Sequence, residues 1–308
     1  MNLYYVHNYW LYEEPMAKDP SGQLAWLIGE LDAAEKAGER VYIIGHMPPG
    51  ARDAFHDASN YFDQIVNRYE ATIAALFFGH THLDEFEISY SNYSQRTSDN
   101  AVAVSYISPS MTPTSGHPAF HVYDVDPLTF GVLDVTTYIA NTSHPAFHSA
   151  DGPVWTKYYS ARETYGAIVK PPLVSLKISD KQSEENVREL DPAFWHEVTE
   201  LFEKDSTAFE GFITRKRRGW QPEVCDNDDC KSAEICKLRA GRAQDNCVPP
   251  GSIHLVNGLA EDIPTSNSGE HECGSSVLAG TLSALAGNPE TRAWLEMIID
   301  GGDQILLA

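Results

Sequence analysis

Three histidines in this sequence stand where two apolar segments end. The segment YIIGHMPPG, residues 42–50, places His46 directly after a glycine, and LFFGHTHLDEF, residues 76–86, does the same for His80 and adds His82. Neutral imidazole is a common ligand of zinc, iron and manganese in proteins. A lone histidine after a strand is usually an ordinary loop residue, but two Gly-His strand ends and a His-x-His motif together favour a metal site. The sequence therefore predicts that His46, His80 and His82 bind metal.

The separation of His80 and His82 indicates more than one metal ion. In an extended loop, residues i and i+2 point to the same side and lie several ångströms apart. Two such histidines can serve two neighbouring ions, and the ions of dinuclear hydrolases lie about 3.5–4 Å apart. Other histidines have no partners at ligand spacing, and we expect them at the surface or in supporting roles. They are His56, His117, His121, His144, His148, His196, His254 and His271.

Two predicted strands must bring the three histidines together. Residues 19–38 have apolar residues at helical spacing between Asp19, a candidate N-cap, and Gly38, a candidate C-cap. The apolar segment VYIIG follows, then a predicted helix at residues 61–73 and a second apolar segment, AALFFG. This strand–helix–strand order is typical of an α/β sheet, whose ligands bind at the carboxyl ends of the strands. Neighbouring strands would therefore bring the histidines to one edge of the sheet.

The pattern changes after the second apolar segment. FEISY, AVAVSYI, AFHVYDVD and FGVLDVTTYI are predicted strands linked by short turns, so the sheet is expected to continue as antiparallel hairpins. Residues 1–150 are predicted to form one α/β domain with an antiparallel edge. Residues 151–250 are predicted to form a small helical unit that begins with VWTKYYSARETYG. Residues 251–308 are predicted to be a low-complexity, partly disordered tail with short helices.

Four of the five cysteines form a cluster, and Cys273 stands apart from it. The cluster contains Cys225, Cys230, Cys236 and Cys247. Zinc sites prefer C-x2-C pairs, which this spacing lacks, so disulfides fit better than metal ligation or free thiols. Four cysteines allow three pairings, of which Cys225–Cys230 with Cys236–Cys247 closes the shortest loops. Disulfides indicate an oxidising compartment.

Composition and short motifs indicate where the protein works and which classes of partner it does not bind. The net charge of -22 and a pI near 4.8 argue against nucleic-acid binding and suit an acidic compartment, where carboxylates become protonated. No stretch of about 18 apolar residues predicts a transmembrane helix. The first residues, MNLYYVHNYWLYEEP, lack the basic and apolar segments of a signal peptide. Glycosylation sequons at Asn92 and Asn141 nevertheless agree with the cysteines in favouring the secretory route.

Several ordered segments resemble one family of enzymes. GHMPPG and GHTH resemble the fourth and fifth motifs of calcineurin-like metallophosphoesterases. With DPSGQLAWLIGELDAAEKAGERVYII, YISPSMTPTSGHPAFHVYDVD, YYSARETYG and the cysteine cluster, they resemble the acid sphingomyelinase family and its acid sphingomyelinase-like phosphodiesterases, in a fungal-looking version. The resemblance covers roughly residues 1–250. It implies the C-terminal half of a metallophosphoesterase β-sandwich flanked by helices, followed by a small helical unit with disulfides.

The resemblance implies a site for two zinc ions that this sequence supplies only in part. His46 and His80 would bind one zinc ion, and His82 would bind the other. The family carries Asp-x-His, Gly-Asp and Asn-His-Glu motifs ahead of the segments quoted above, and none stands ahead of them here. We therefore expect the other ligands and the catalytic histidine to lie upstream of Met1, in an N-terminal half of the same fold.

Nearby carboxylates are not expected to replace the missing ligands. None of them stands at a strand end in the register that the histidines occupy. They are Asp53, Asp57, Asp84 and Glu85. The chain alone is therefore expected to hold an incomplete site.

The implied activity is that of a phosphoric diester hydrolase, secreted or vacuolar/lysosomal in its full-length form. Two zinc ions would bind the phosphodiester and generate a hydroxide that attacks phosphorus. Sphingomyelin would yield ceramide and phosphocholine. Two other hypotheses stay open. The substrate could be a nucleotide, polyphosphate or another phosphosphingolipid, or the chain could be a catalytically inactive interaction module.

Overall fold

The computed structural model describes residues 18–52, 54–113, 115–150, 152–173, 188–222 and 224–247, and two short strands, β8 (Leu255–Val256) and β9 (Leu259–Ala260). The described residues up to Cys247 belong to one compact unit, called the main unit below, and β8 and β9 belong to a second. Within the second unit, β8 and β9 pair antiparallel. The short helices expected in the tail and Cys273 lie outside the described residues.

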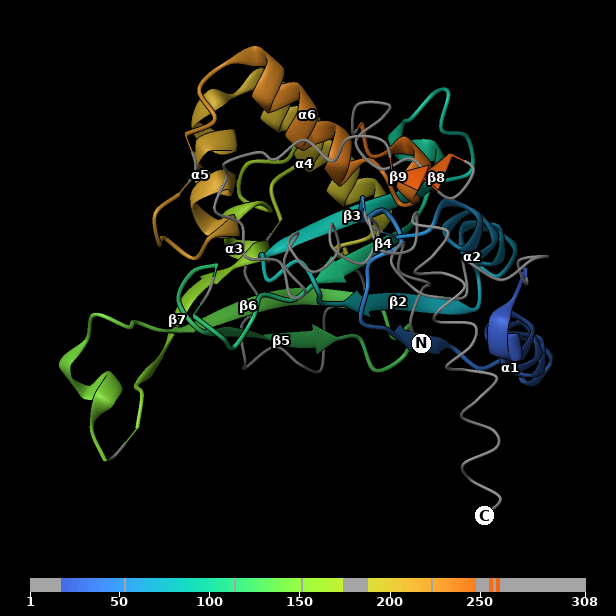
Figure 1. Cartoon of the computed structure of the whole chain (residues 1–308), viewed down its shortest axis with the longest axis horizontal. Coiled ribbons are helices and arrows are strands. Elements are labelled where there is room, and N and C mark those ends of the chain that lie inside the picture. Colours follow the sequence, from blue (N-terminus) through green and yellow to red (C-terminus); the bar gives the residue numbers. More distant parts are fainter. Residues whose placement is uncertain are drawn as a thin grey trace. The chain divides into compact units, whose positions relative to one another are not determined.

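The first sheet of the main unit has four strands in the order β1-β2-β4-β3 (Figure 1). β1, β2 and β4 run parallel, and β3 pairs antiparallel with β4 at the edge. The strands are β1 (Val41–Ile44), β2 (Ile73–Phe78), β3 (Glu85–Tyr90) and β4 (Ala101–Ile107). Helices α1 (Gln23–Ala37) and α2 (His56–Arg68) precede β1 and β2. The predicted α/β sheet with an antiparallel edge is confirmed.

Helix α1 ends at the predicted Gly38 cap but begins after Gly22, three residues later than the predicted N-cap Asp19. A 3-10 turn, Pro20–Gly22, precedes the helix. The Asp19 carboxylate accepts hydrogen bonds from the backbone N–H groups of Leu24 and Ala25 at 3.0 and 2.9 Å. Gly38 ends the helix with φ at 69°, a left-handed conformation that glycine adopts without a steric penalty. Asp19 therefore caps the helix from ahead of the 3-10 turn.

A second, antiparallel sheet contains β5 (Ala119–Val125), β6 (Val132–Ala140) and β7 (Trp155–Ser160) in that order. The helix predicted from VWTKYYSARETYG is therefore wrong over β7. Its aromatic and β-branched residues favour a strand where a partner edge, here β6, is present. The short helix α3 (Ala161–Thr164) begins only after Ser160, whose Oγ accepts a hydrogen bond from the N–H of Glu163 at 3.0 Å.

Three longer helices lie on the side of β3 and β4 (Figure 1). They are α4 (Pro192–Lys204), α5 (Ser206–Lys216) and α6 (Asp228–Leu238). Each begins at a side chain that accepts a hydrogen bond from the first turn, namely Asp191, Asp205 and Asn227. Such caps satisfy backbone N–H groups that have no partner within the helix. The predicted helical character of this region is confirmed for α4 to α6.

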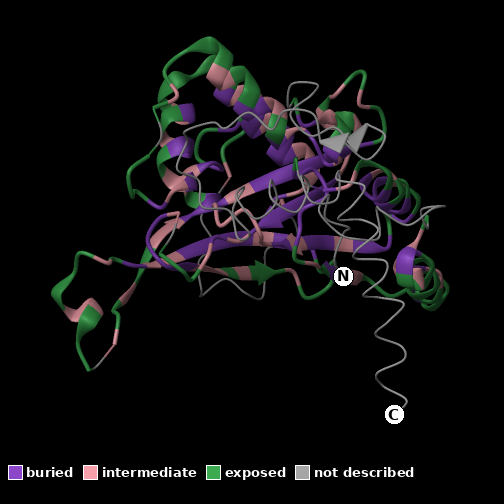
Figure 2. Ribbon diagram, viewed as in Figure 1, coloured by how far each residue is buried: buried purple, intermediate pink, exposed green. Residues whose placement is uncertain are grey.

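An aromatic core joins these helices to both sheets. Trp195 of α4 packs against Phe86 of β3 with ring centroids 4.3 Å apart, and its indole N–H donates to the Tyr106 hydroxyl at 3.2 Å. Val135 of β6 belongs to the same buried cluster. Figure 2 shows this burial as purple along the strands and on the inner faces of the helices. A second buried cluster contains Ile43 of β1 and Leu76 of β2 and packs these strands against α1 and α2.

Two disulfides fix the end of the main unit. Cys225 is bonded to Cys230, and Cys236 is bonded to Cys247. This is the sequential pairing that closes the shortest loops. Together the two bridges fix both ends of α6, because Cys230 and Cys236 lie within that helix.

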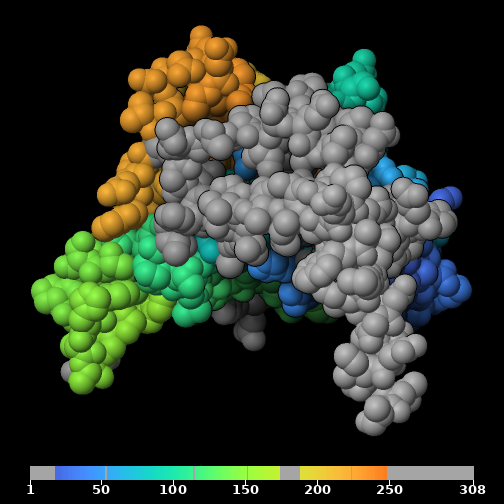
Figure 3. Space-filling model, in the orientation of Figure 1, coloured from blue at the N-terminus to red at the C-terminus, as the bar shows by residue number. Residues whose placement is uncertain are grey.

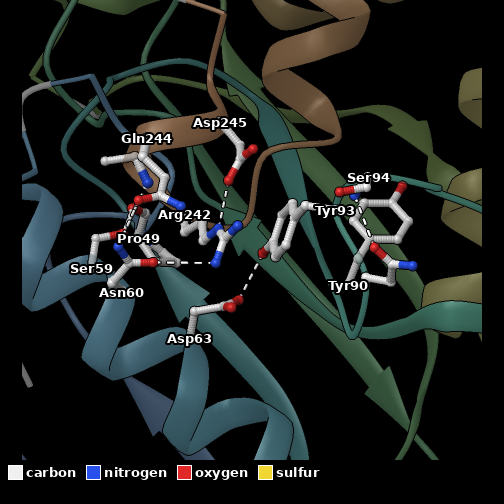
Figure 4. Close-up of polar contacts among 12 residues, drawn as sticks. Pro49, Ser59, Asn60, Asp63, Tyr90, Tyr93, Ser94, Arg242, Gln244 and Asp245 are labelled. Atoms are coloured by element: carbon white, nitrogen blue, oxygen red, sulfur yellow. Dashed lines mark hydrogen bonds and ion pairs between the residues drawn. The ribbon is translucent and has the colours of Figure 1, made fainter.

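One cluster of side chains ties α2 to the β3–β4 loop and to the last residues of the main unit (Figure 4). The Tyr93 hydroxyl donates to Asp63 Oδ1 at 2.7 Å. The Arg242 guanidinium lies 4.1 Å from the centre of the Tyr93 ring and donates to Asn60 Oδ1 at 3.2 Å and to Asp245. These contacts, called the Asp63 cluster below, connect segments that are far apart in the sequence.

Candidate metal centre

Two of the predicted ligands meet where β1 and β2 end. The two strands are parallel neighbours. The N–H of Gly45 donates to the carbonyl of Phe77, and the N–H of Gly79 donates to the carbonyl of His46, each at 2.9 Å. His46 Nε2 and His80 Nδ1 lie 3.2 Å apart. The prediction that neighbouring strands bring these two histidines to one sheet edge is confirmed.

The spacing of these nitrogens suits a shared metal ion. Two imidazole nitrogens bound to one tetrahedral zinc ion at about 2.0–2.1 Å would lie about 3.3 Å apart. The distance between His46 Nε2 and His80 Nδ1 is 3.2 Å. Within the described residues, no group of three or more His, Cys, Asp or Glu side chains is close enough to hold one ion. The geometry of His46 and His80 is therefore compatible with two donors to one ion.

His80 and His82 lie in a tight turn, so the expected extended loop is wrong. Their φ angles are 72° and 62°, in the left-handed region. That conformation costs a non-glycine residue roughly 1–2 kcal/mol. Local hydrogen bonds close the turn: Thr81 N–H donates to the Gly79 carbonyl at 2.9 Å, and Leu83 N–H donates to Thr81 Oγ1 at 3.2 Å. We call residues 79–84 the histidine turn.

The surroundings of His82 favour its neutral form. Burial lowers the pKa of His82 below its ordinary value, and the neighbouring His80 and Arg218 lower it further. A neutral imidazole keeps a lone pair for a metal ion, whereas an imidazolium has none. The electrostatics of the turn therefore suit a ligand role for His82.

The carboxylate at the end of the histidine turn is bound by the second sheet. Asp84 is buried. It accepts hydrogen bonds from Thr137 Oγ1 at 2.8 Å and from the Tyr159 hydroxyl at 3.0 Å, and its Oδ1 lies 3.2 Å from His121 Nε2. These partners come from β6, β7 and β5, so each strand of the second sheet contributes one. Asp84 therefore joins the histidine turn to that sheet.

The other nearby carboxylates lie in different surroundings. Glu85 forms an ion pair with Lys216 at 3.5 Å. Asp57 is exposed in the first turn of α2. Asp53 lies outside the described residues.

Three of the other histidines have little-exposed side chains with hydrogen-bonding partners, in agreement with the supporting roles expected for them: His117, His121 and His196. His121 lies in strand β5, and its Nδ1 is 3.0 Å from the Tyr123 hydroxyl. His196 lies in α4, and its Nδ1 is 2.8 Å from the Tyr90 hydroxyl. Their partners come from other elements or from the same strand, so ligand spacing along the sequence could not identify them.

Arg218 is a site residue that the sequence predictions missed. Its side chain is fully buried. Its Nη1 donates to the carbonyl of His82 at 2.8 Å, and its Nε donates to the carbonyl of His117 at 3.0 Å. Burial lowers the pKa of Arg218 to about 10, so the side chain stays cationic below that pH. The available signal in the sequence is the basic run RKRRGW in a strongly acidic chain.

Both sequons lie in exposed turns. Asn92 Oδ1 accepts a hydrogen bond from Ser94 N–H at 3.0 Å, and Asn141 Oδ1 accepts one from Ser143 N–H at 2.9 Å. Both asparagines are exposed. The segment between β6 and β7 that follows Asn141 projects away from the second sheet (Figures 1 and 3). Both sequons are therefore accessible at the surface of the main unit.

The fold and the strand-end histidines are consistent with a metallophosphoesterase-like α/β protein. No family model matches the chain. The chain is 35% identical over 269 residues to the sphingomyelin phosphodiesterase of Homo sapiens, a match that covers 84% of this chain and 38% of that protein. It is 33% identical over 239 residues to sphingomyelin phosphodiesterase 1 of Caenorhabditis elegans, covering 77% of this chain and 37% of that protein.

A further relative carries a different name. The acid sphingomyelinase-like phosphodiesterase 3b of Homo sapiens is 28% identical over 261 residues, which cover 77% of this chain and 49% of that protein. The chain thus belongs to the family of the sphingomyelin phosphodiesterases and the acid sphingomyelinase-like phosphodiesterases, and the family resemblance is confirmed, whereas its fungal-looking character stays a prediction. It spans less than two fifths of the length of the sphingomyelin phosphodiesterases described here.

Proposed function

We propose that this chain carries part of the active site of a sphingomyelin phosphodiesterase, which hydrolyses sphingomyelin to ceramide and phosphocholine. The observation that carries the proposal is the pair of imidazole nitrogens 3.2 Å apart at the ends of two parallel strands. The names of two homologues, both sphingomyelin phosphodiesterases, support the same activity. The chemistry is that of a phosphoric diester hydrolase.

We propose that His46 and His80 hold one zinc ion and that His82 holds a second. The donors fit this metal, because imidazole nitrogen is one of its usual ligands and the two nitrogens of the pair have the required spacing. Zinc bound here would polarise a phosphoryl oxygen and lower the pKa of a bound water. The protein's part is positional: the ends of β1 and β2 fix His46 and His80, and the histidine turn fixes His82.

A second candidate keeps the site and changes the substrate. One relative is named only as an acid sphingomyelinase-like phosphodiesterase, and this name leaves room for a phosphodiester or phosphate compound other than sphingomyelin, such as a nucleotide, polyphosphate or another phosphosphingolipid. The same imidazole donors would serve this reaction. A comparison of sphingomyelin with small phosphodiesters distinguishes the two candidates. A chain that binds no zinc would instead support the inactive interaction module.

Removal of one imidazole from the pair is expected to weaken zinc binding more than about 100-fold. Even residues that only support metal ligands typically contribute 10–100-fold to metal affinity. The measurement is isothermal titration of the purified chain with ZnCl₂, for the unaltered chain and for His80→Ala. His148→Ala is the matched control, because His148 is exposed in the projecting segment between β6 and β7. Equal affinities for all three proteins would contradict the proposed site.

We also propose that the protein works in an acidic, oxidising compartment, either secreted or in a vacuole or lysosome. The two disulfides support an oxidising compartment. The exposed sequons at Asn92 and Asn141 and the acidic composition agree with it. Among the helices of the described residues, none combines the length and the apolar character needed to cross a bilayer.

Mass spectrometry of secreted protein tests this location. Non-reduced peptides are expected to contain the Cys225–Cys230 and Cys236–Cys247 bridges, with Cys273 unpaired or in an intermolecular bond. Glycans are expected on Asn92 and Asn141, and treatment with an N-glycosidase should remove them. Four alkylatable thiols among the clustered cysteines of secreted material would contradict the oxidising compartment.

A further inference from the structure

The histidine turn is held from outside by one buried arginine. Arg218 follows α5, and its guanidinium reaches the carbonyls of two distant segments. Nη1 donates to the His82 carbonyl at 2.8 Å and Nε donates to the His117 carbonyl at 3.0 Å, while Nη1 also lies 3.2 Å from the Lys216 carbonyl. A single side chain therefore links the histidine turn, the loop before β5 and the end of α5.

The backbone near the Arg218 guanidinium has unusual conformations that make room for this side chain. Gly116 has φ at 144°, and a Cβ placed on it would lie 2.6 Å from Arg218 Cζ, so glycine leaves the room that the guanidinium occupies. Arg218 is itself left-handed, with φ at 53°, as are His80 and His82. Three non-glycine residues in this conformation meet at one place. Strained backbone persists where surrounding contacts over-determine it, and it concentrates at functional sites.

The last residue of the histidine turn, Asp84, is anchored to the same helix end. The N–H of Asp84 donates to the carbonyl of Lys216 at 3.0 Å, two residues before Arg218. The Asp84 carboxylate is held by the three strands of the second sheet, as described above. The turn is thus fixed at its end by Asp84 and at the His82 carbonyl by Arg218, and both contacts involve the end of α5.

Within the described part of the chain, one nitrogen of the buried Arg218 guanidinium lacks a hydrogen bond. Arg218 Nη2 is buried and has no hydrogen-bond partner among the residues that the structure describes. An unsatisfied buried donor is uncommon in native proteins and calls for an explanation. A planar fork that reaches two separate carbonyls provides one, because a lysine ammonium cannot reproduce that geometry.

We propose that Arg218 is a positioning residue for the metal site: it holds the backbone of His82 so that the histidine turn keeps its ligand geometry. This rests on the proposed function, in which His80 and His82 are metal ligands. Arg218 touches neither metal nor substrate in this role and acts through the His82 carbonyl. The helical region that follows the second sheet thereby positions the proposed ligands of the histidine turn, which connects β2 to β3 of the first sheet.

The test uses the 308-residue chain and measures two quantities separately: the hydrogen exchange of the histidine turn without metal, and the affinity of the chain for zinc. Hydrogen exchange of the backbone amides of residues 79–84 is followed without metal, and zinc affinity is measured by isothermal titration with ZnCl₂. The variants are Arg218→Met, which is close in length but has no donors, and Arg218→Lys. The matched control is Arg162→Met, because Arg162 is also a buried arginine that donates to two carbonyls, those of Leu133 and Arg188.

Arg218→Met is expected to speed exchange of the histidine turn at least about tenfold and to weaken zinc binding 10–100-fold, as loss of a ligand's supporting partner does. Arg218→Lys is expected to show nearly the same faster exchange and the same loss of zinc affinity as Arg218→Met. Arg162→Met is expected to lower the melting temperature to a similar degree and to leave both the turn and the zinc affinity unchanged. If Arg218→Met does not fold, Gly116→Ala is the second variant: its Cβ would lie 2.5 Å from the Arg217 carbonyl oxygen and 2.6 Å from Arg218 Cζ, so it displaces the guanidinium together with its backbone and is expected to give the same two changes.

The two measurements separate this proposal from the proposed function. An unaltered chain that binds no zinc would contradict the metal site, while faster exchange confined to residues 79–84 in Arg218→Met would still support the anchoring role. Unchanged exchange of the turn in Arg218→Met, or equal changes in Arg162→Met, would overturn the proposal. Faster exchange with unchanged zinc affinity would overturn the link between the turn and the metal site.

Discussion

Supplied with zinc, the purified 308-residue chain is expected to hydrolyse sphingomyelin at least about 100-fold more slowly than human sphingomyelin phosphodiesterase assayed beside it. Among the described residues, no three His, Cys, Asp or Glu side chains are close enough together to hold one metal ion. The sequence also contains no Asn-His-Glu motif to supply the expected catalytic histidine. A general acid or base typically contributes 10²–10⁴-fold in rate. The measurement is turnover at acidic pH on sphingomyelin and on bis(p-nitrophenyl) phosphate.

The controls for this assay are the substitutions His46→Ala and His82→Ala. If the chain is as slow as expected, neither substitution lowers the residual rate much further. Robust turnover that both substitutions abolish would mean that the remaining ligands lie within this chain, and the prediction would be wrong. Addition of a polypeptide that carries the Asp-x-His, Gly-Asp and Asn-His-Glu motifs of a homologue is expected to raise the rate, because it would complete the ligand set.

The meeting of His46 and His80 could be predicted because local patterns determine it. An apolar segment of four to six residues that ends in glycine is recognisable as a buried strand, and a helix between two such segments makes them parallel. Parallel neighbours end at the same edge, so the two imidazoles had to come close. The left-handed turn at His80 and His82 could not be predicted in this way, because positive φ is uncommon for a residue other than glycine and because Arg218 and Lys216, which help to hold the turn, are distant in the sequence.

The features that the sequence could not reveal depend on contacts between distant segments. Trp155–Ser160 forms a strand because β6 offers it an edge, although YYSARETYG also suits a helix. Arg218 lies 136 residues from the carbonyl that it binds, and its burial is unexpected for an arginine in a basic run. His121 reaches Asp84 only because the two sheets pack together. In each case tertiary packing, and not local sequence, decides the conformation or the role.

Asp63, the buried carboxyl of the Asp63 cluster, is expected to make the stability of the protein depend on pH. Burial raises the pKa of Asp63 from its ordinary value to about 6, and the hydrogen bond from Tyr93 and the charge of Arg242 lower it only in part. The folded protein therefore keeps this carboxyl protonated in a pH range where the unfolded chain has already ionised it. The Asp245 carboxylate on the other side of Arg242 raises the pKa of Asp63 slightly.

The sign of the pH dependence follows from proton binding. Between about pH 4 and pH 6 the folded state binds more protons at Asp63 than the unfolded state, so the contribution of Asp63 to stability falls as the pH rises. A shift from 3.8 to about 6 corresponds to roughly 3 kcal/mol of lost stability above pH 6. His196 acts in the opposite direction, because burial lowers its pKa and favours the folded state at higher pH. Only a comparison with an Asp63 variant isolates the effect.

Asp63→Asn is therefore expected to raise the free energy of unfolding by roughly 2–3 kcal/mol at pH 7.5 and to change it little at pH 4, because the amide stays neutral and can still accept the Tyr93 hydroxyl. The measurement is urea unfolding of both proteins at pH 4.0, 5.0, 6.0 and 7.5, with the difference plotted against pH. Asp57→Asn, an exposed carboxylate on the same helix, controls for the loss of one charge. A difference that does not grow between pH 4 and pH 6 would show that Asp63 is already ionised in the folded protein. A difference that grows between pH 4 and pH 6 would mean that the ionisation of Asp63 costs the fold least under acidic conditions, in agreement with the proposed acidic compartment.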